Sequence, residues 1–192
     1  MKKFSFSSFE DFPVSNTDKT KLKQVIKRLD VKKNTVVIPQ GEVSQNIFFL
    51  RSGLVKLNYL TENGKEFIKS FIHEGNMFGS LHSIMTGGAS TFGAVALEDL
   101  DLEVMNYSLF QEFVKNSPQF QQFALSFFQQ LALKKELREY EFLCLSAQQR
   151  YERLRQQQPA LVDRIKQADL ALYLGITPIA LSRMKHRPKQ SN

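Results

Sequence analysis

The sequence is poor in cysteine and histidine and contains no tryptophan. Its single cysteine, Cys144, excludes an internal disulfide framework. The three histidines, His73, His82 and His186, are scattered and show none of the spacings of a metal site. We therefore expect no metal ion and no required cofactor. We expect the Cys144 thiol to be buried and inert, with a redox switch as the alternative.

Long apolar runs are also missing. No stretch approaches the roughly 20 apolar residues that a membrane span needs, and the basic amino terminus is not followed by the apolar core of a signal peptide. These absences predict a cytoplasmic protein without a membrane partner. Hydrophobic residues make up 42% of the 192 residues, which is enough to form the cores of one large or two small domains.

The sequence offers no recognisable catalytic constellation. Its densest acidic cluster alternates with apolar residues, as the solvent face of a strand would. That cluster comprises Glu98, Asp99, Asp101 and Glu103. Ser80 and His82 lie two positions apart, but no third residue or oxyanion-binding group can be assigned to them. We therefore expect that the chain is not an enzyme.

The segment Gln167–Met184 has the pattern of a helix-turn-helix. Gly175 can adopt the left-handed conformation that ends a first helix, Thr177 can cap a second helix, and Pro178 suits the first position of that helix. Apolar or small residues at helical spacing would pack the two helices together: Leu170, Ala171, Leu174, Ile176, Leu181 and Met184. The second helix, from Pro178 to about Arg187, would lie in a DNA major groove. A helical hairpin that only closes a core is the alternative.

Positive charge is concentrated around this motif. Of the formal net charge of +7, residues 1–133 contribute little, with 14 lysines and arginines against 13 aspartates and glutamates. Residues 134–192 carry 12 against 6. A basic surface of this kind is typical of a site that neutralises nucleic-acid phosphates, although a merely solvated face can also be basic. The basic residues that bracket the motif are Arg164, Lys166, Arg183, Lys185, Arg187 and Lys189.

Between residues 34 and 107 the pattern changes to short β-branched and aromatic runs. It predicts strands at 35–38, 46–50, 54–60, 66–72, 92–97 and 102–107. Glycines separate the runs at intervals of 12, 11 and 11 residues: Gly41, Gly53, Gly64 and Gly75. The pair Asn63-Gly64 predicts a hairpin turn with a positive φ at both positions. We expect an antiparallel sandwich or barrel.

Helical periodicity appears on both sides of the strands. It predicts helices at 18–29, 109–116, 118–143 and 147–158. Their expected caps are Asp18, Ser108 and Ser146, and Pro118 opens the long helix. The stretch Phe78–Thr91 is the longest irregular part of the β region. A short helix beginning at Ser80 would expose backbone N–H groups able to hold an anion, but a surface loop without a ligand fits equally well.

The long helix carries a regular apolar seam. Its members recur at steps of four, three and four residues: Phe120, Ala124, Phe127 and Leu131. This spacing suits a coiled-coil partner, so we predict a dimer interface along the seam. Phe123 and Phe128 lie off the seam and would pack on the chain's own β domain. In the alternative, the seam itself packs there.

The glycine-punctuated strands, the long helix and the carboxyl-terminal helix-turn-helix together resemble the Crp/Fnr superfamily of bacterial transcription regulators, most closely its short Bacteroidetes-type members. The resemblance is carried by VVIPQGEVSQNIFFLRSGLVKL (Val36–Leu57), EGNMFGSL (Glu74–Leu81) and LALYLGITPIALSRMK (Leu170–Lys185). It implies an α+β fold with three parts. These are a jelly-roll-like antiparallel β-roll sensor domain (1–117), a long dimerisation helix (118–145), and a helix-turn-helix domain without an evident wing (146–192).

The resemblance also implies a homodimeric transcription regulator that binds double-stranded DNA, with RNA polymerase as a further candidate partner. An unidentified small effector in the β-roll would change the geometry of the two DNA-reading helices. The implied effector pocket comprises Phe78, Gly79, Ser80, Leu81, Ser90 and Thr91. Ser80 and the pair Ser90-Thr91 replace the glutamate and the Arg-Ser pair that hold cyclic AMP in other members. We therefore expect no ordinary response to cyclic AMP.

The DNA-binding residues that the resemblance implies lie in and after the second helix of the motif. They are Thr177, Pro178, Ile179, Ser182, Arg183, Lys185, His186 and Arg187. Arg183 matches a base-reading arginine and could form a bidentate contact with guanine. Pro178 and Ile179 stand where other members have hydrogen-bonding base readers, and Ile179 can touch only a thymine methyl group. The alternative function is a ligand-binding module that acts through protein partners with little or no specific DNA binding.

Overall fold

The computed structural model describes residues 7–12 and 14–185, and its centre is a β-roll of two four-stranded antiparallel sheets. One sheet has the order β1 (Lys27–Val31), β8 (Leu100–Asn106), β3 (Asn46–Ser52) and β6 (Asn76–Phe78). The other has the order β2 (Val36–Ile38), β7 (Gly93–Ala96), β4 (Leu54–Leu60) and β5 (Glu66–His73). The predicted α+β class with an antiparallel β-roll is confirmed.

Apolar side chains from both sheets meet inside the roll. They include Phe48 and Leu102 from the first sheet and Val55 and Ala94 from the second. Because successive side chains of a strand point to opposite faces, the alternation in the sequence places one set of residues in this core. Phe48 and Phe78 stack there with ring centroids 5.1 Å apart, so aromatic rings fill part of the interior.

The hairpin between β4 and β5 is present, but its turn differs from the predicted type. Gly64 has a φ of +77°, whereas Asn34 is the only described non-glycine residue with a positive φ, so Asn63 does not adopt one. The Gly64 N–H donates to the Thr61 carbonyl, and the Thr61 N–H donates to the Lys65 carbonyl. A single left-handed glycine after an ordinary turn therefore closes the hairpin.

The predicted helix at 18–29 is too long. Helix α1 spans Asn16–Val25 and is capped by Ser15 rather than Asp18. The chain then enters β1, in which Leu29 lies opposite Leu102 of β8. Pairing with β8 overrides the helical periodicity of these residues, since tertiary contacts routinely outweigh local propensity. Strands β1 and β6, the short helix η1 (Phe9–Asp11) and helix α6 (Pro159–Arg164) were not predicted.

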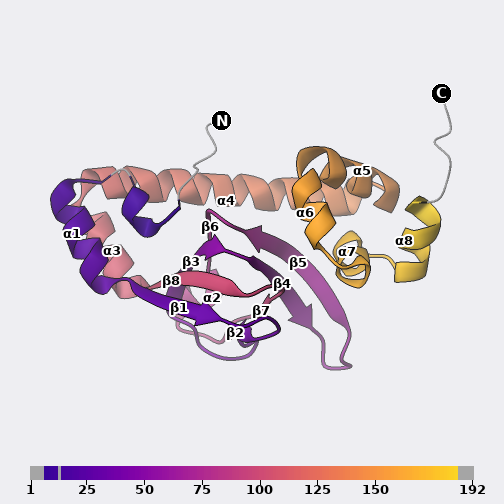
Figure 1. Cartoon of the computed structure of the whole chain (residues 1–192), viewed down its shortest axis with the longest axis horizontal. Helices are drawn as coiled ribbons and strands as arrows, with labels where there is room; N and C mark the ends of the chain where they lie inside the picture. Colours follow the sequence, from indigo (N-terminus) through magenta and orange to yellow (C-terminus); the bar gives the residue numbers. More distant parts are fainter. Residues whose placement is uncertain (1–6, 13, 186–192) are drawn as a thin grey trace.

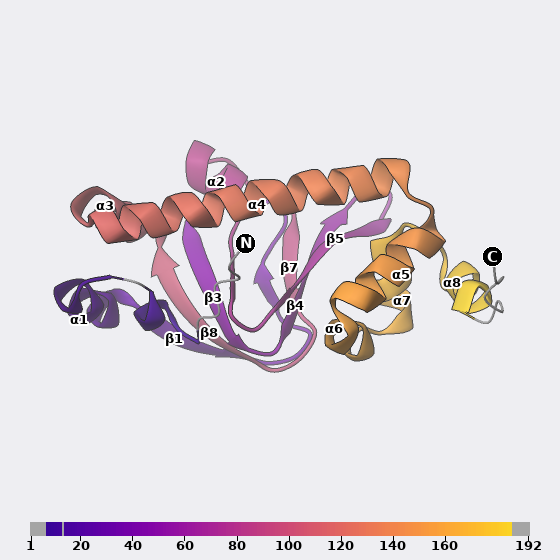
Figure 2. The same ribbon diagram turned by 90° about the horizontal axis from the view of Figure 1, so that it is seen from above.

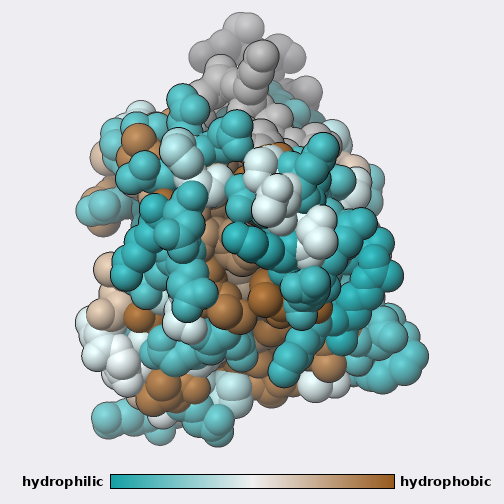
Figure 3. Space-filling view, turned by 90° about the vertical axis from the view of Figure 1, so that its left-hand side faces the viewer, coloured by the Kyte–Doolittle hydropathy of each residue, from teal (hydrophilic) through white to brown (hydrophobic). Residues whose placement is uncertain are grey.

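Helix α4 (Pro118–Cys144) runs along the length of the molecule, with α1 and α3 (Tyr107–Asn116) at one end and the later helices at the other (Figure 1, Figure 2). Ser117 caps α4, and Pro118 occupies its first turn. Its beginning packs in a phenylalanine-rich cluster between η1, α1, α3 and the strands. At this end of the molecule apolar surface lies between polar side chains (Figure 3).

The position of this cluster overturns the first half of the predicted dimer seam, at Phe120 and Ala124. Phe120 and Ala124 are 0% and 4% exposed within their own chain, so neither can face a second subunit. Phe127 packs against the same cluster, and Leu131 is half-buried. Phe123 does pack internally as predicted, with its ring centroid 4.1 Å from that of Phe12. The alternative interpretation, in which the seam packs on its own chain, is therefore correct for Phe120 and Ala124, whereas the interface role of Phe127 and Leu131 stays a prediction.

Up to Lys185, where the described residues end, four helices follow α4, and they share a core with the β-roll. They are α5 (Ala147–Gln157), α6 (Pro159–Arg164), α7 (Gln167–Leu174) and α8 (Pro178–Lys185). Ser146 and Gln149 form a capping box at the start of α5. Ile68 and Phe71 of β5 lie in one apolar cluster with Leu170 and Leu174 of α7. No helix in the described part of the chain is both long and apolar enough to cross a membrane.

Candidate nucleic-acid interface

Helices α7 and α8 form the predicted helix-turn-helix. Gly175 ends α7 with a φ of +71°, which an L side chain rarely adopts. The Thr177 hydroxyl accepts a hydrogen bond from the Ala180 N–H at 3.2 Å and so caps α8. Leu181 is fully buried and packs with apolar residues of α7. The opposite side of α8 therefore faces solvent.

The outer side of α8 carries the predicted DNA-binding residues. Those within the described residues are all exposed: Thr177, Pro178, Ile179, Ser182, Arg183 and Lys185. His186 and Arg187, predicted for the same role, lie outside the described residues. Ile179 is 67% exposed, although burial in the chain would stabilise such a side chain. A helix with an exposed arginine and an exposed isoleucine can offer a fork to guanine and a methyl contact to thymine.

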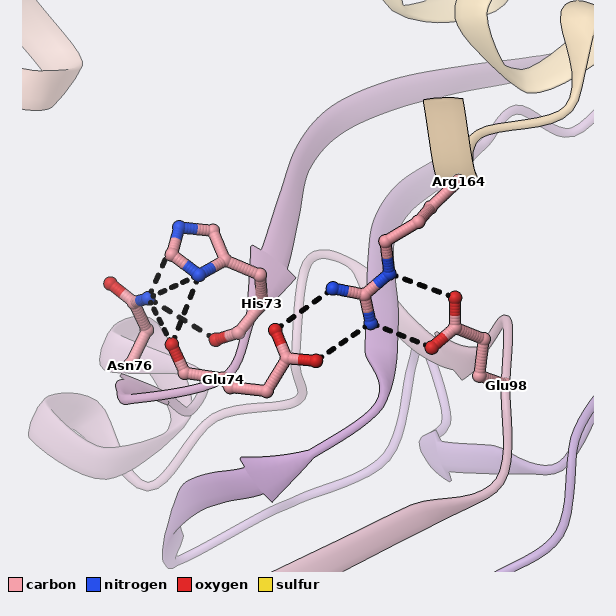
Figure 4. Close-up of polar contacts among 5 residues, drawn as sticks. All are labelled: His73, Glu74, Asn76, Glu98 and Arg164. Carbon is pink, nitrogen blue, oxygen red and sulfur yellow. Dashed lines mark hydrogen bonds and ion pairs between the residues drawn. The ribbon is translucent and has the colours of Figure 1, made fainter. Parts of the chain in front are cut away.

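One arginine of the predicted basic patch has a different role. Arg164 in α6 donates from Nε and Nη2 to the two carboxylate oxygens of Glu98, at 3.0 and 2.6 Å. Its Nη1 donates to Glu74 at 2.9 Å (Figure 4). These bonds hold the pKa of the Glu74 carboxyl below its usual value and raise the pKa of Arg164. Arg164 therefore fastens the helix-turn-helix unit to the β-roll and is not free for phosphates.

A second ion-pair network holds α7 on the sheet. Lys56 of β4 lies 2.8 Å from Glu66 of β5 and 3.1 Å from Asp169 of α7. All three side chains are largely buried. Burial lowers the pKa of Lys56, but hydrogen bonds to Glu66 and Asp169 outweigh burial and raise it overall. Asp169 was not singled out in the sequence, because an acidic residue in a first helical turn is ordinary.

Four of the six predicted effector residues have structural roles in this fold. The Ser80 hydroxyl caps α2 (Leu81–Thr86) by accepting from the Ser83 N–H at 3.4 Å. The Ser90 hydroxyl donates to the Phe92 carbonyl at 2.7 Å. Phe78 stacks in the core, and a Cβ on Gly79 would lie only 2.9 Å from the Asn46 carbonyl oxygen. Leu81 is half-buried and Thr91 exposed.

Two surface grooves lie elsewhere. One of about 590 Å³ runs between α3 and α4 and is lined by residues that include Phe110, Val114, Leu125 and Phe128. A neighbouring groove of about 240 Å³ includes Ile84 of α2. Neither groove is lined by the six predicted effector residues. The structure therefore does not bring those six together around either groove.

Lys69 of β5 is a half-buried lysine whose ammonium group lies against aromatic rings. Its Nζ lies 3.8 Å from the centroid of the Phe92 ring and 5.6 Å from that of Tyr59. Burial, together with the like charge of Lys135 on α4, lowers the pKa of Lys69 to about 8. The sequence gives no signal for this residue, because a lysine in a polar strand position normally faces solvent.

Two further expectations concern reactive side chains. Within residues 7–12 and 14–185, no three His, Cys, Asp or Glu side chains group as metal ligands would. Cys144, expected to be buried, is exposed at the end of α4. The neighbouring Phe142 and Leu143 are exposed as well, so the rest of the described chain covers this part of α4 only partly.

Comparison with known proteins identifies a family match and several proteins of similar structure. Residues 28–117 match the family described as "Cyclic nucleotide-binding domain". An "Uncharacterized protein" from Haemophilus influenzae is 30% identical over 90 residues, which cover 47% of this chain and 69% of that protein. The structure of FixK2 from Bradyrhizobium japonicum superimposes with a TM-score of 0.74 at 16% identity, covering 84% of this chain and 83% of FixK2.

A transcriptional regulator from Eubacterium rectale, assigned to the crp/fnr family, gives a TM-score of 0.70 at 16% identity. The match covers 89% of this chain and 82% of that regulator. The similarity thus extends beyond the β-roll to the long helix and the carboxyl-terminal helices. Residues 28–117 therefore match the cyclic nucleotide-binding domain family, and the chain has the fold seen in the solved Crp/Fnr-type regulators.

Proposed function

We propose that the chain is a homodimeric, DNA-binding transcription regulator. The observation that carries this proposal is α8, which presents Ile179, Ser182 and Arg183 to solvent on a helix-turn-helix closed by Gly175. In this proposal residues 1–117 form the sensor domain, 118–145 the dimerisation helix and 146–192 the DNA-binding domain. Catalysis has no part in it, and no cofactor is required.

The proposed dimer uses the exposed side of α4. On the second half of α4, beyond the buried phenylalanines, exposed residues recur at steps of four, three and four: Leu133, Leu137, Tyr140 and Cys144. This spacing is that of a two-stranded coiled coil. Exposed apolar residues in such a row favour a partner of the same kind, and a second copy supplies one by symmetry.

Two α8 helices would then lie about 34 Å apart, one turn of DNA, and meet a pseudo-palindromic site. Arg183 supplies the guanine contact, Ile179 the thymine contact, and Thr177 and Lys185 the phosphate contacts. Ser80 and Ser90 form hydrogen bonds within the chain, and no arginine stands at position 90 to bind a cyclic phosphate. Cyclic AMP is therefore not the proposed effector.

Selection of bound duplexes from a random pool tests this function. The ligand-free protein should enrich a pseudo-palindrome whose affinity falls steeply with salt, because phosphate contacts release counterions. If no duplex is enriched, with or without small metabolites from a cell extract, the proposal fails. In that case the groove between α3 and α4 would favour a binding module that acts through other proteins.

A further inference from the structure

Two arginines from outside the helix-turn-helix bind the end of its first helix. Arg138 of α4 donates from Nη2 to the Tyr173 carbonyl at 2.6 Å. Arg150 of α5 donates from Nη2 to the Leu174 carbonyl at 2.7 Å. The last carbonyls of a helix lack partners within the helix, and they carry its negative dipole end. Both guanidinium groups therefore bind α7 immediately before the turn that leads to α8.

Arg150 also binds the end of α4. Its Nη1 donates to the Leu145 carbonyl at 2.6 Å and to the Phe142 carbonyl at 3.3 Å. One planar guanidinium thus joins the carboxyl ends of two helices, with different nitrogens for each. Lysine cannot reproduce this arrangement, because its ammonium group is a single point of donation.

An aromatic ring completes the contact. The Phe142 ring centroid lies 5.4 Å from the Arg138 guanidinium and 5.0 Å from that of Arg150. A Cβ on Gly175 would lie 3.1 Å from the same ring. Arg138, Arg150 and Phe142 therefore contact the end of α7 and the turn at Gly175.

Neither arginine is committed to a carboxylate. Among the described residues, Arg138 and Arg150 form no ion pair within 4.0 Å. Burial, and next the like charge of Arg138, lowers the pKa of Arg150. Holding two cations together in this way is unfavourable unless the helix carbonyls compensate for it.

We propose that Arg138 and Arg150 are positioning residues for DNA recognition, which fix the helix-turn-helix turn on the carboxyl end of α4. This inference rests on the proposed function. In a dimer joined along α4, the separation of the two α8 helices depends on how rigidly each motif is held on its α4. The clamp formed by Arg138, Arg150 and Phe142 therefore sets the half-site spacing that the dimer accepts.

The test uses the full-length protein and the operator found by selection, with one base pair added or removed between its half-sites. The wild type should bind both altered operators about tenfold more weakly than the selected one. Arg150→Lys and Arg138→Lys should bind all three within about threefold, and should bind the selected operator about tenfold more weakly than the wild type. Arg155→Lys, at an exposed position of the same helix α5, should behave as the wild type.

Spacing tolerance distinguishes positioning from mere stability, because partial unfolding would weaken binding to all duplexes equally. The proposal is overturned if the lysine variants keep the wild-type spacing preference, or if their loss on random DNA equals their loss on the operator. Phe142→Leu provides a second route if Arg150→Lys does not fold, and it should also broaden the spacing. A wild type that selects no operator would instead refute the proposed function.

Discussion

Arg164 and Glu98 form a two-pronged ion pair across 66 positions of the chain, with N···O distances of 3.0 and 2.6 Å. Arg164 ends α6, immediately before the helix-turn-helix, whereas Glu98 lies between β7 and β8 of the roll. Both side chains are about one third exposed, so their contribution to the free energy of unfolding is modest, about 1 kcal/mol. The fork geometry makes the pair directional, and it orients α6 on the roll.

Glu74 is the second carboxylate bound by Arg164, and it should make the attachment of α6 to the β-roll depend on pH. Its pKa is held below the ordinary 4.5 by Arg164, so its stabilising effect is complete above pH 4.5 and is lost as pH falls through the lower folded value. We expect the difference in thermal midpoint between wild type and Glu74→Gln to be largest at neutral pH and to disappear in acid. A difference that grows in acid would contradict this sign.

Lys56→Met should be strongly destabilising. It leaves the buried carboxylate of Asp169 without its cation, which costs about 3 kcal/mol in the free energy of unfolding measured in urea. Lys32→Met is the matched control, because the ion pair of Lys32 with Asp99 is exposed, and it should leave stability almost unchanged. Equal effects of the two substitutions would mean that the Lys56 network contributes nothing specific.

Gly175→Ala should cost more stability than Gly64→Ala. Both glycines have a φ above +70°, so each alanine pays about 1 kcal/mol of backbone strain. Nothing lies within 4 Å of a Cβ on Gly64, whereas on Gly175 it would press on the Phe142 ring and cost about 1 kcal/mol more. Urea unfolding of both variants measures the difference, which Phe142→Leu in the Gly175→Ala background should reduce.

Leu137→Glu should dissociate the proposed dimer. A carboxylate in the exposed row of Leu133, Leu137, Tyr140 and Cys144 would be desolvated opposite its own copy, so sedimentation should report monomers at concentrations where the wild type is dimeric. Leu29→Glu, at an exposed apolar position of β1, should remain dimeric.

Cys144 gives a covalent check on the same interface. It is the only cysteine, so any disulfide-linked dimer must join two Cys144 residues. A parallel pairing of α4 predicts that oxidation links the wild type and fails to link Leu137→Glu. Equal cross-linking of both proteins would place the interface elsewhere.

Arg183→Ala should relax base preference at one position of the operator. The expected loss is about 1 to 3 kcal/mol on the selected site and little on random DNA, measured by fluorescence anisotropy. Lys185→Ala removes only a phosphate contact, so it should weaken both duplexes alike and lower the salt dependence. The base-reading role is wrong if Arg183→Ala shows the uniform pattern of Lys185→Ala.

The helix-turn-helix could be predicted from the sequence because its determinants are local. A left-handed glycine at 175, a capping hydroxyl at 177 and a proline at 178 act within four residues, and Leu181 follows at helical spacing. The capping box at Ser146 and the start of α4 at Pro118 were predictable for the same reason.

The side of α4 that would face a second subunit could not be predicted from local sequence. Phe120 and Ala124 have the same step of four as Leu133 and Leu137, so periodicity favours neither stripe. Only the arrival of η1 and α3 beside the start of α4, which places Phe12 against Phe123, decides that the first stripe is internal.

What the sequence by itself determined, then, is what neighbouring residues impose on one another: most strands of the β-roll, the capping box at Ser146 and the turn of the motif. It did not determine the caps of α1 and α3, which are Ser15 and Asn106 instead of the predicted Asp18 and Ser108. Tertiary structure alone decided the partners of Arg164, Asp169 and Arg150, which lie on helices or loops distant in the chain. The physical reason is that a charge count records the sign of a side chain, whereas its role depends on which carboxylate or carbonyl folding brings within hydrogen-bonding distance.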